Sequence, residues 1–386
     1  MVHSKPSPAS HAAPATPIDL DLREDVADLT ARLMDIESVS GNERALADAI
    51  ESALRRIPGL EVHRDGDAIV ARTHLGRSER VVLAGHLDTV PLPTTPGARG
   101  TVPVSWDGET LYGRGATDMK GGVAVQLALA ATLQDPNRDV TFIFYDHEEV
   151  EGSKSGLGRL FRNSPEMLGG DFAILLEPTN GTVEGGCNGT SRYKVRTRGV
   201  AAHSARAWMG ENAIHAAAPI LRILAEYTPK TVDVDGLEFR ESLNAVRING
   251  GIAGNVIPDY CEVEVNYRFA PDKDVAAAEA HVFELFEGFE IIRTDGAGGA
   301  RPGLRHPAAA SFVAAVGQTP KPKFGWTDVA RFSELGIPAV NFGPGDALLA
   351  HSDDEHVTRT AIHDCLSALR RWLGGASAPG GAGVGA

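Results

Sequence analysis

The chain has 386 residues, 42% of them hydrophobic, and a formal net charge of −14. This length exceeds one average domain, and the composition is typical of a soluble globular protein with a sizeable core. The acidic balance argues against nucleic acid or an anionic membrane as a partner, because both would repel the chain. Three widely separated cysteines without a Cys-x-x-Cys pair predict neither disulfides nor a thiolate metal site, so a reducing, cytoplasmic compartment fits best.

The two ends of the chain differ from the rest in composition. Residues 1–19 are rich in Pro, Ala and Ser without the apolar core of a signal peptide, and residues 375–386 are rich in Gly and Ala. We expect both to be disordered tails. No apolar run reaches the roughly 18 residues that a membrane span needs.

Between the tails, amphipathic helices alternate with short apolar runs, which predicts an α/β fold with a mostly parallel sheet flanked by helices. The expected strands are 81–84, 140–145, 172–176 and 339–342. The expected helices include 26–36, 43–54, 122–133 and 328–335.

The pattern changes between residues 190 and 304. The expected elements there are strand 193–198, helix 212–227, strands 242–249 and 260–269, helix 273–287 and strand 290–293. Their order, β-α-β-β-α-β, predicts a ferredoxin-like α+β domain. We therefore expect it to be inserted into a discontinuous larger domain made of residues 20–189 and 305–374.

Acidic and histidine side chains follow the expected strands, and one more carboxylate lies in a glycine-dense loop that opens a helix. These residues are His86, Asp88, Asp118, Glu148, Glu149, Glu177 and His351. Open α/β sheets bind ligands outside the carboxyl ends of their strands, so we expect these side chains to converge. Each motif alone is common on a solvated surface, and only their joint placement indicates a site.

Imidazole and carboxylate ligands without thiolate suit Zn, Mn, Co or Fe(II). One carboxylate can bridge two ions, and Asp118 is the natural bridge. If the strand continues past His86, the Asp88 carboxylate lies on the same side and can orient the imidazole. Glu148 and Glu149 are neighbours, so one can bind metal while the other takes a proton from an activated water.

These motifs resemble those of the M20 family of metallopeptidases and deacylases. The resemblance rests on 85–88, 115–122, 148–149, 177–178 and His351, and it spans roughly residues 20–374. It implies a zinc-bearing catalytic domain and an inserted lid that commonly also forms a dimer. It further implies two Zn²⁺ ions per subunit, replaceable by Co²⁺ or Mn²⁺. The implied metal ligands are His86 and Glu177 for one ion, Glu149 and His351 for the other, and Asp118 as the bridge.

The same resemblance implies roles in catalysis and substrate binding. Glu148 would be the general base, Asp88 would act beside His86, and His203 would polarise the scissile carbonyl, often from the partner subunit. The implied substrate-binding residues are Arg192, Asn255, Arg268 and Thr327. For Arg192, a solvated surface arginine is the alternative interpretation.

Within the family, residues 198–206, 324–332 and 341–346 are most similar to the actinobacterial type of succinyl-diaminopimelate desuccinylase. This implies hydrolysis of N-succinyl-LL-2,6-diaminopimelate, a step of lysine and diaminopimelate biosynthesis, by a homodimer joined through the lid. Residues 187–192 depart from the Arg-Arg-Gly-Ser stretch of other desuccinylases, which puts one carboxylate anchor in doubt. The alternatives are an N-acetylornithine deacetylase, an aminoacylase, a carboxypeptidase, or a non-catalytic binding protein, for which a base at Glu148 would be superfluous.

Overall fold

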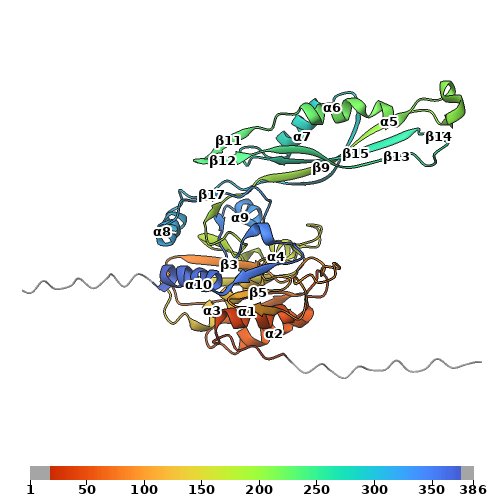
Figure 1. The fold of residues 1–386 in the computed structure, drawn as a ribbon. Coiled ribbons are helices and arrows are strands. Elements are labelled where there is room, and N and C mark those ends of the chain that lie inside the picture. The colour runs from red at the N-terminus through yellow and green to blue at the C-terminus, as the bar shows by residue number, and fades with distance from the viewer. Residues whose placement is uncertain (1–17, 375–386) are drawn as a thin grey trace, which may run out of the picture.

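The computed structural model describes residues 18–374, which form two units joined by extended connections (Figure 1). The larger unit contains an eight-stranded sheet and the smaller unit a four-stranded sheet. The tails expected at residues 1–19 and 375–386 lie outside the described residues, apart from residues 18 and 19.

The eight-stranded sheet is parallel at its centre, where β6, β3, β7 and β18 are neighbours, and this centre is flanked on both sides by antiparallel pairs. This agrees with the predicted mostly parallel sheet. In spatial order its strands are β1 (Glu61–Asp65), β2 (Ala68–Arg72), β6 (Asp139–Tyr145), β3 (Arg80–His86), β7 (Phe172–Leu175), β18 (Ala339–Asn341), β8 (Glu184–Gly185) and β17 (Lys321–Pro322).

Helices cover both faces of this sheet, because alternate strand residues are apolar on both sides. Val81 and Leu83 belong to one buried cluster, whereas Val82 and Ala84 belong to another. The first cluster includes residues of α1 (Val26–Asp35), α2 (Arg44–Arg55), α3 (Lys120–Thr132), α8 (Pro307–Val316) and α10 (Arg359–Gly374). The second includes residues of α4 (Gly156–Asn163) and α9 (Val329–Glu334).

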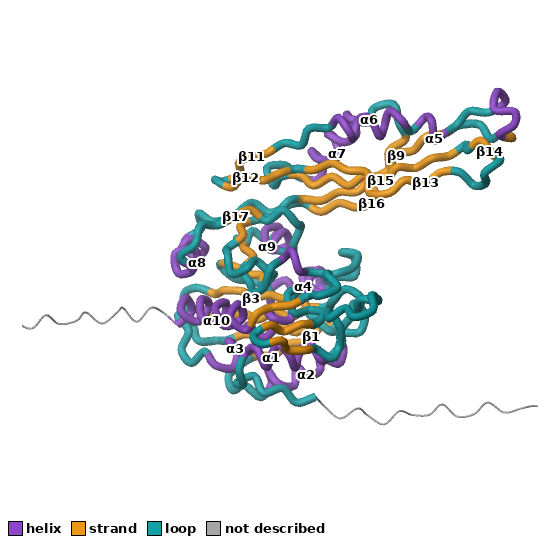
Figure 2. Tube along the Cα trace, viewed as in Figure 1, coloured by secondary structure: helices purple, strands orange, loops and turns teal. Residues whose placement is uncertain are grey.

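The smaller unit has the predicted ferredoxin-like topology. Its antiparallel sheet runs in the order β13 (Ser242–Gly250), β15 (Tyr260–Phe269), β9 (Gly189–Arg198) and β16 (Glu290–Ala297). The helices α5 (Ala213–Ala216), α6 (Ala218–Glu226) and α7 (Val275–Leu285) pack on one face. Figure 2 shows α6 and α7 on the side away from the larger unit, so the open face of the sheet turns toward that unit.

Shorter elements complete the two units. A three-stranded sheet joins β19 (His356–Thr358), β5 (Thr110–Tyr112) and β4 (Ser105–Asp107), and two antiparallel pairs join β10 (Ala202–His203) with β14 (Val256–Ile257) and β11 (Thr231–Val234) with β12 (Leu237–Arg240). Short 3-10 helices occupy Pro165–Met167, Ser204–Met209 and Ala347–Leu349.

One expected helix differs from the prediction. The helix expected over 212–227 is divided at Ala217 into α5 and α6. Pro219 lies in the first turn of α6, and proline has no amide hydrogen to continue the helix of the preceding turn. Our division of the chain at residues 190 and 304 remains a proposal, which the separate sheets support. Within residues 18–374, no helix combines the length and apolar character that a bilayer crossing needs.

Gly122 allows α3 to pack closely on the end of β7. A Cβ atom at this position would come within 2.3 Å of the backbone oxygen of Leu176. We expect Gly122→Ala to lower the free energy of unfolding by about 1–3 kcal/mol, because this clash outweighs the gain in helix propensity. Urea unfolding followed by circular dichroism measures the change. Gly325→Ala is the matched control, since no atom lies within 4 Å of its added Cβ. Equal midpoints for the two variants would contradict the close contact.

Candidate metal centre

The predicted residues come together at the carboxyl ends of the central parallel strands. His86 is the last residue of β3, which lies between β6 and β7 in the sheet. Glu148 and Glu149 follow β6, and Glu177 follows β7. Because these strands are parallel and in register, their following loops meet at one edge.

Asp118 lies between the two histidines of the cluster. One of its oxygens, Oδ1, lies 3.0 Å from His86 Nε2, and the other, Oδ2, lies 3.4 Å from His351 Nε2. The same nitrogen of His351 lies 2.9 Å from Glu149 Oε1. The carboxylate of Asp118 therefore presents one oxygen to each histidine, which is the geometry that a bridging ligand requires.

Three overlapping groups of side chains have ligand atoms within 4.8 Å of one another. They are His86, Asp118 and Glu177; Asp118, Glu149 and His351; and His86, Glu148 and Glu149. The first two groups share Asp118 and reproduce the two predicted sets of ligands. Imidazole and carboxylate are the donors that catalytic zinc and similar cations prefer. The assignment of these five side chains as ligands remains a proposal, and their donor set fits it.

The cluster holds more negative charge than its neighbours offset. Burial and the charges of Glu177, Asp328 and Glu149 raise the pKa of Glu148 well above its usual value, although His86 opposes them. Burial and Asp118 raise the pKa of Glu177 to about 7. Glu177 Oε1 is buried and has no hydrogen-bond partner within residues 18–374. Divalent cations would balance this charge, and the Oε1 atom of Glu177 could bind one of them.

The histidines lower the pKa of Asp118, and Asp118 in turn raises the pKa of the histidines. Hydrogen bonding to Asp118 and to Glu149 raises the pKa of His351 to about 10. The two histidines hold the pKa of Asp118 below its usual range even though burial opposes them. The ionised carboxylate is the form that binds a cation, so its immediate neighbours keep Asp118 ready to act as a ligand.

Backbone hydrogen bonds hold the segment that carries Glu148 and Glu149. The buried Asp88 carboxylate accepts from the amide of Glu148 at 2.9 Å and from the amide of Glu149 at 3.0 Å. Its Oδ2 also accepts from the hydroxyl of Ser40 at 2.7 Å. Glu43 Oε1 accepts from the amide of His147 at 3.3 Å. These contacts fix the backbone of both glutamates without using their own carboxylate oxygens.

Asp88 contacts His86 differently from the sequence-based expectation. His86 Nδ1 lies 3.0 Å from the backbone oxygen of Asp88 and 3.6 Å from its Oδ1 atom. The strand ends at His86, so the alternation of side chains on which the prediction relied stops there. The backbone oxygen is thus the nearer partner of the imidazole, and the carboxylate is used mainly by the Glu148–Glu149 segment.

His203 and Asn255 lie away from this cluster within the same chain. His203 is on β10, which pairs with β14, and the amide of Ser204 donates to the backbone oxygen of Asn255 at 2.9 Å. Figure 1 shows β14 at the end of the smaller unit that extends beyond the larger unit. His203 is exposed, and its Nδ1 accepts from the amide of Ala205 at 3.1 Å. Its Nε2 therefore carries the proton of the neutral ring.

The two predicted arginines lie together on the open face of the smaller sheet. Arg192 pairs in register with Asn266, two residues from Arg268. Burial and the charge of Arg192 lower the pKa of Arg268, and Arg192 itself is half-exposed and 3.6 Å from Asp295. Thr327 lies in the larger unit, where its buried hydroxyl donates to Asn341 Oδ1 at 3.0 Å.

Sequence reasoning missed two buried charged residues that contact the Asp118 loop. Glu355 accepts hydrogen bonds from the amides of Thr117 and Asp118 and pairs with Arg114. Arg114 lies inside the glycine-dense loop, and Glu355 follows His351 by four residues. Their proximity to predicted ligands was a signal, but the separation of 241 residues between them hides the pairing.

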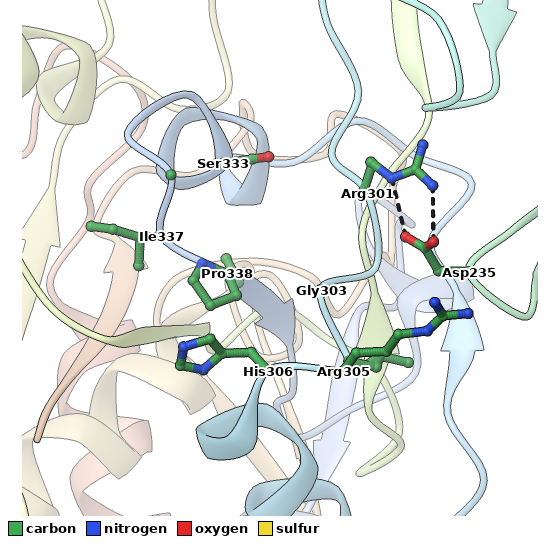
Figure 3. Close-up of a pocket in the computed structure, with 11 residues that line it drawn as sticks. Asp235, Arg301, Gly303, Arg305, His306, Ser333, Ile337 and Pro338 are labelled. Carbon is green, nitrogen blue, oxygen red and sulfur yellow. Dashed lines mark hydrogen bonds and ion pairs between the residues drawn. The ribbon is translucent and has the colours of Figure 1, made fainter.

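A cavity of about 370 Å³ lies apart from the clustered carboxylates. It is lined by the connection that returns from the smaller unit, including His306, by the turn before β18, and by Asp235 of the β11–β12 turn (Figure 3). Arg301 Nη2 lies 2.9 Å from Asp235 Oδ1 at one side of this cavity. None of the predicted site residues lines it.

Comparison with known proteins agrees with this fold. The model of the family described as Peptidase family M20/M25/M40 matches residues 82–374, more than half of the chain. The chain therefore belongs to this family, as the sequence motifs predicted.

Two curated relatives come from actinobacteria. The chain is 52% identical over 359 residues to a protein named putative succinyl-diaminopimelate desuccinylase DapE from Mycobacterium tuberculosis, covering 92% of this chain and 100% of the relative. It is 45% identical over 365 residues to a succinyl-diaminopimelate desuccinylase from Corynebacterium glutamicum, covering 92% and 97%. Both relatives are matched over almost their whole length.

Solved structures share the fold at low sequence identity. A tripeptidase from Staphylococcus aureus superposes with a TM-score of 0.73 at 20% identity, covering 91% of this chain and 98% of the other. A Bacillus subtilis protein described as a dinuclear metal-binding peptidase of the M20 family has a TM-score of 0.65 at 17% identity, covering 91% and 97%. These likenesses place both units of the chain within one known fold.

The cluster predicts the metal stoichiometry of the chain. We expect the chelator-treated protein to bind two Zn²⁺ ions per chain, with stabilisation of about 2.7 kcal/mol for each ion at a hundredfold excess over its Kd. Asp118→Ala removes the carboxylate shared by both ligand groups, so both ions should bind more weakly. Isothermal titration calorimetry and native mass spectrometry measure the binding. Asp107→Ala, which removes an exposed carboxylate of the same unit, is the control. Unchanged binding by Asp118→Ala would refute the bridge.

Proposed function

We propose that the chain is a dinuclear zinc amide hydrolase that removes succinate from N-succinyl-LL-2,6-diaminopimelate. The observation that carries the hydrolase chemistry is the position of Glu148 beside His86 and Glu149, two members of the cluster that also contains Asp118, Glu177 and His351. The names of the two actinobacterial relatives support the choice of substrate. Co²⁺ or Mn²⁺ is proposed to replace Zn²⁺ in the same donor set.

Glu148 is proposed to move the proton in both halves of the reaction. Divalent cations at the cluster supply Lewis-acid polarisation of the amide carbonyl and lower the pKa of water. The Glu148 carboxylate takes a proton from the water, whose oxygen attacks the carbonyl carbon to give a tetrahedral oxyanion. When the C–N bond breaks, Glu148 returns the proton to the departing amine nitrogen. The backbone contacts from Asp88 hold Glu148 in place for both transfers.

Recognition of the substrate is assigned to both units. The substrate has three carboxylates, and Arg192 and Arg268 offer adjacent guanidinium groups on the sheet face that turns toward the larger unit. Thr327 and Asn255 are proposed as further polar contacts. The Nε2–H of His203 is proposed to donate to the oxyanion, since Nδ1 already accepts from Ala205.

A homodimer joined through the smaller unit would bring His203 to the metal cluster of the partner. The observation that supports this is the exposed apolar surface of that unit. Val246 and Ile248 are 56% and 49% exposed on the edge strand β13, and Ile252 and Trp208 nearby are 86% and 79% exposed. Exposed apolar side chains on an unpaired strand edge are typical of protein interfaces.

A cytoplasmic location is part of this proposal. Cys187, Cys261 and Cys365 are free and buried in the described structure. Thiols without disulfides are typical of a reducing compartment. A small, soluble N-acyl amino acid is the substrate that this compartment would supply.

The substrate proposal is tested with a panel of amides. We expect the zinc-loaded chain to hydrolyse N-succinyl-LL-diaminopimelate faster than N-acetylornithine, other N-acyl amino acids or peptides. Glu148→Gln should keep both ions but lower kcat by about 10²–10⁴, because the amide cannot accept the proton. Release of free amine measures turnover, and chelator treatment provides the metal-free control. Faster hydrolysis of an acetyl or peptide substrate would replace the proposed substrate, and full turnover by Glu148→Gln would remove its proposed role.

Mixed dimers test whether His203 acts across the subunit interface. Glu148→Gln and His203→Ala should each be nearly inactive alone. In a heterodimer of the two, one site combines Glu148 of one subunit with His203 of the other. The purified heterodimer should therefore retain roughly half of the wild-type activity.

The experiment uses differently tagged chains, co-expressed and purified through both tags. The matched control pairs Glu148→Gln with the double variant Glu148→Gln/His203→Ala, in which no site has a base. No recovery in the test pair would show that His203 does not serve the partner's site.

A further inference from the structure

The pair formed by Arg114 and Glu355 is buried beside the metal cluster. Glu355 is fully buried and Arg114 is 4% exposed, and Arg114 Nη1 donates to Glu355 Oε2 at 2.8 Å. The other oxygen, Oε1, accepts from the amides of Thr117 at 3.0 Å and Asp118 at 3.1 Å. Both carboxylate oxygens of Glu355 thus have hydrogen-bond partners, which compensates its burial.

These contacts connect two loops that carry proposed metal ligands. One loop contains Arg114 and Asp118, and the other contains His351 and Glu355. Besides the ion pair, Arg114 donates to the backbone oxygen of Ser352 at 3.2 Å, directly after His351. The pair therefore links the loop of Asp118 to the loop of His351, and the facing side-chain atoms of these two residues are 3.4 Å apart.

The two proposed ions depend differently on these loops. His86 ends β3 and Glu177 follows β7, so both lie next to the central parallel strands of the sheet. His351 lies on a loop, its side chain is half-exposed, and its backbone φ angle is +63°. A left-handed conformation is strained for a residue other than glycine and persists only when surrounding contacts impose it.

We propose that Arg114 and Glu355 are positioning residues for the second metal position, the one formed by Glu149, His351 and Asp118. This inference rests on the proposed metal pair. The charge of Glu355 keeps Arg114 across the two loops, and its Oε1 keeps the backbone of Asp118 in place. Weakening the pair moves His351 relative to Asp118 and leaves the position formed by His86 and Glu177 largely intact.

Glu355→Gln tests this proposal, because it keeps the shape of the side chain but removes the charge that binds Arg114. We expect the full-length variant to bind one Zn²⁺ ion with wild-type affinity and the second about 10–100-fold more weakly. Competition between chelator-treated protein and a chromophoric zinc chelator measures both affinities without reference to activity. Arg114→Lys keeps the positive charge but loses the several N–H donors of the guanidinium group. It should reduce the affinity for the second ion less than Glu355→Gln does.

Glu241→Gln is the matched control. Glu241 is also buried, and it accepts from the amide of Ala270 and pairs with Lys273, but it lies in the smaller unit. It should lower stability without changing zinc affinity. If Glu355→Gln does not fold, Arg114→Lys provides the same measurement.

Three outcomes separate the inference from the proposed function. Two wild-type affinities in Glu355→Gln, or equal weakening of both ions, overturn the positioning role while the metal pair stands. A wild-type chain that binds fewer than two ions contradicts the metal pair itself, and the positioning role falls with it. Selective weakening of one ion supports both.

Discussion

The site depends on holding several carboxylates close together against their mutual repulsion. Two unit charges 4 Å apart interact with about 4 kcal/mol at an effective dielectric constant of 20. Backbone amides stabilise two of the buried carboxylates, because they donate hydrogen bonds to Asp88 and Glu355. These two acidic residues fix loops, whereas Glu177 keeps an oxygen without a partner within residues 18–374. The clustered carboxylates therefore keep negative charge that bound cations would neutralise.

The arrangement of the cluster was predictable because it follows from sheet topology. Short apolar runs predicted parallel strands, and parallel strands place the residues that follow them at one edge. To predict that His86, Glu149 and Glu177 lie together, it was therefore enough to locate the ends of their strands. The ferredoxin-like unit was predictable for a similar reason, since its order of elements is distinctive and its two central strands, β9 and β15, alternate in burial over most of their length.

Long-range contacts between loops were not predictable from local patterns. Arg114 and Glu355 are separated by 241 residues. Neither belongs to a periodic pattern of apolar residues that would predict its burial. The same holds for the contact between Asp88 and the amides of Glu148 and Glu149, because it depends on where β3 ends. The break at Ala217 had a local signal in Pro219, which argued against one continuous helix.

The proposed substrate contacts lie in two separate places within one chain. Arg192 and Arg268 lie on β9 and β15 near Cys187, which packs in the core of the larger unit. His203 and Asn255 lie at the opposite, extended end of the smaller unit (Figure 1). A substrate held between the cluster and the arginines of one chain thus lacks an oxyanion donor from that chain's own β10. In the proposed homodimer, a second chain would supply this donor, and the exposed edge strand β13 is the surface proposed for that contact.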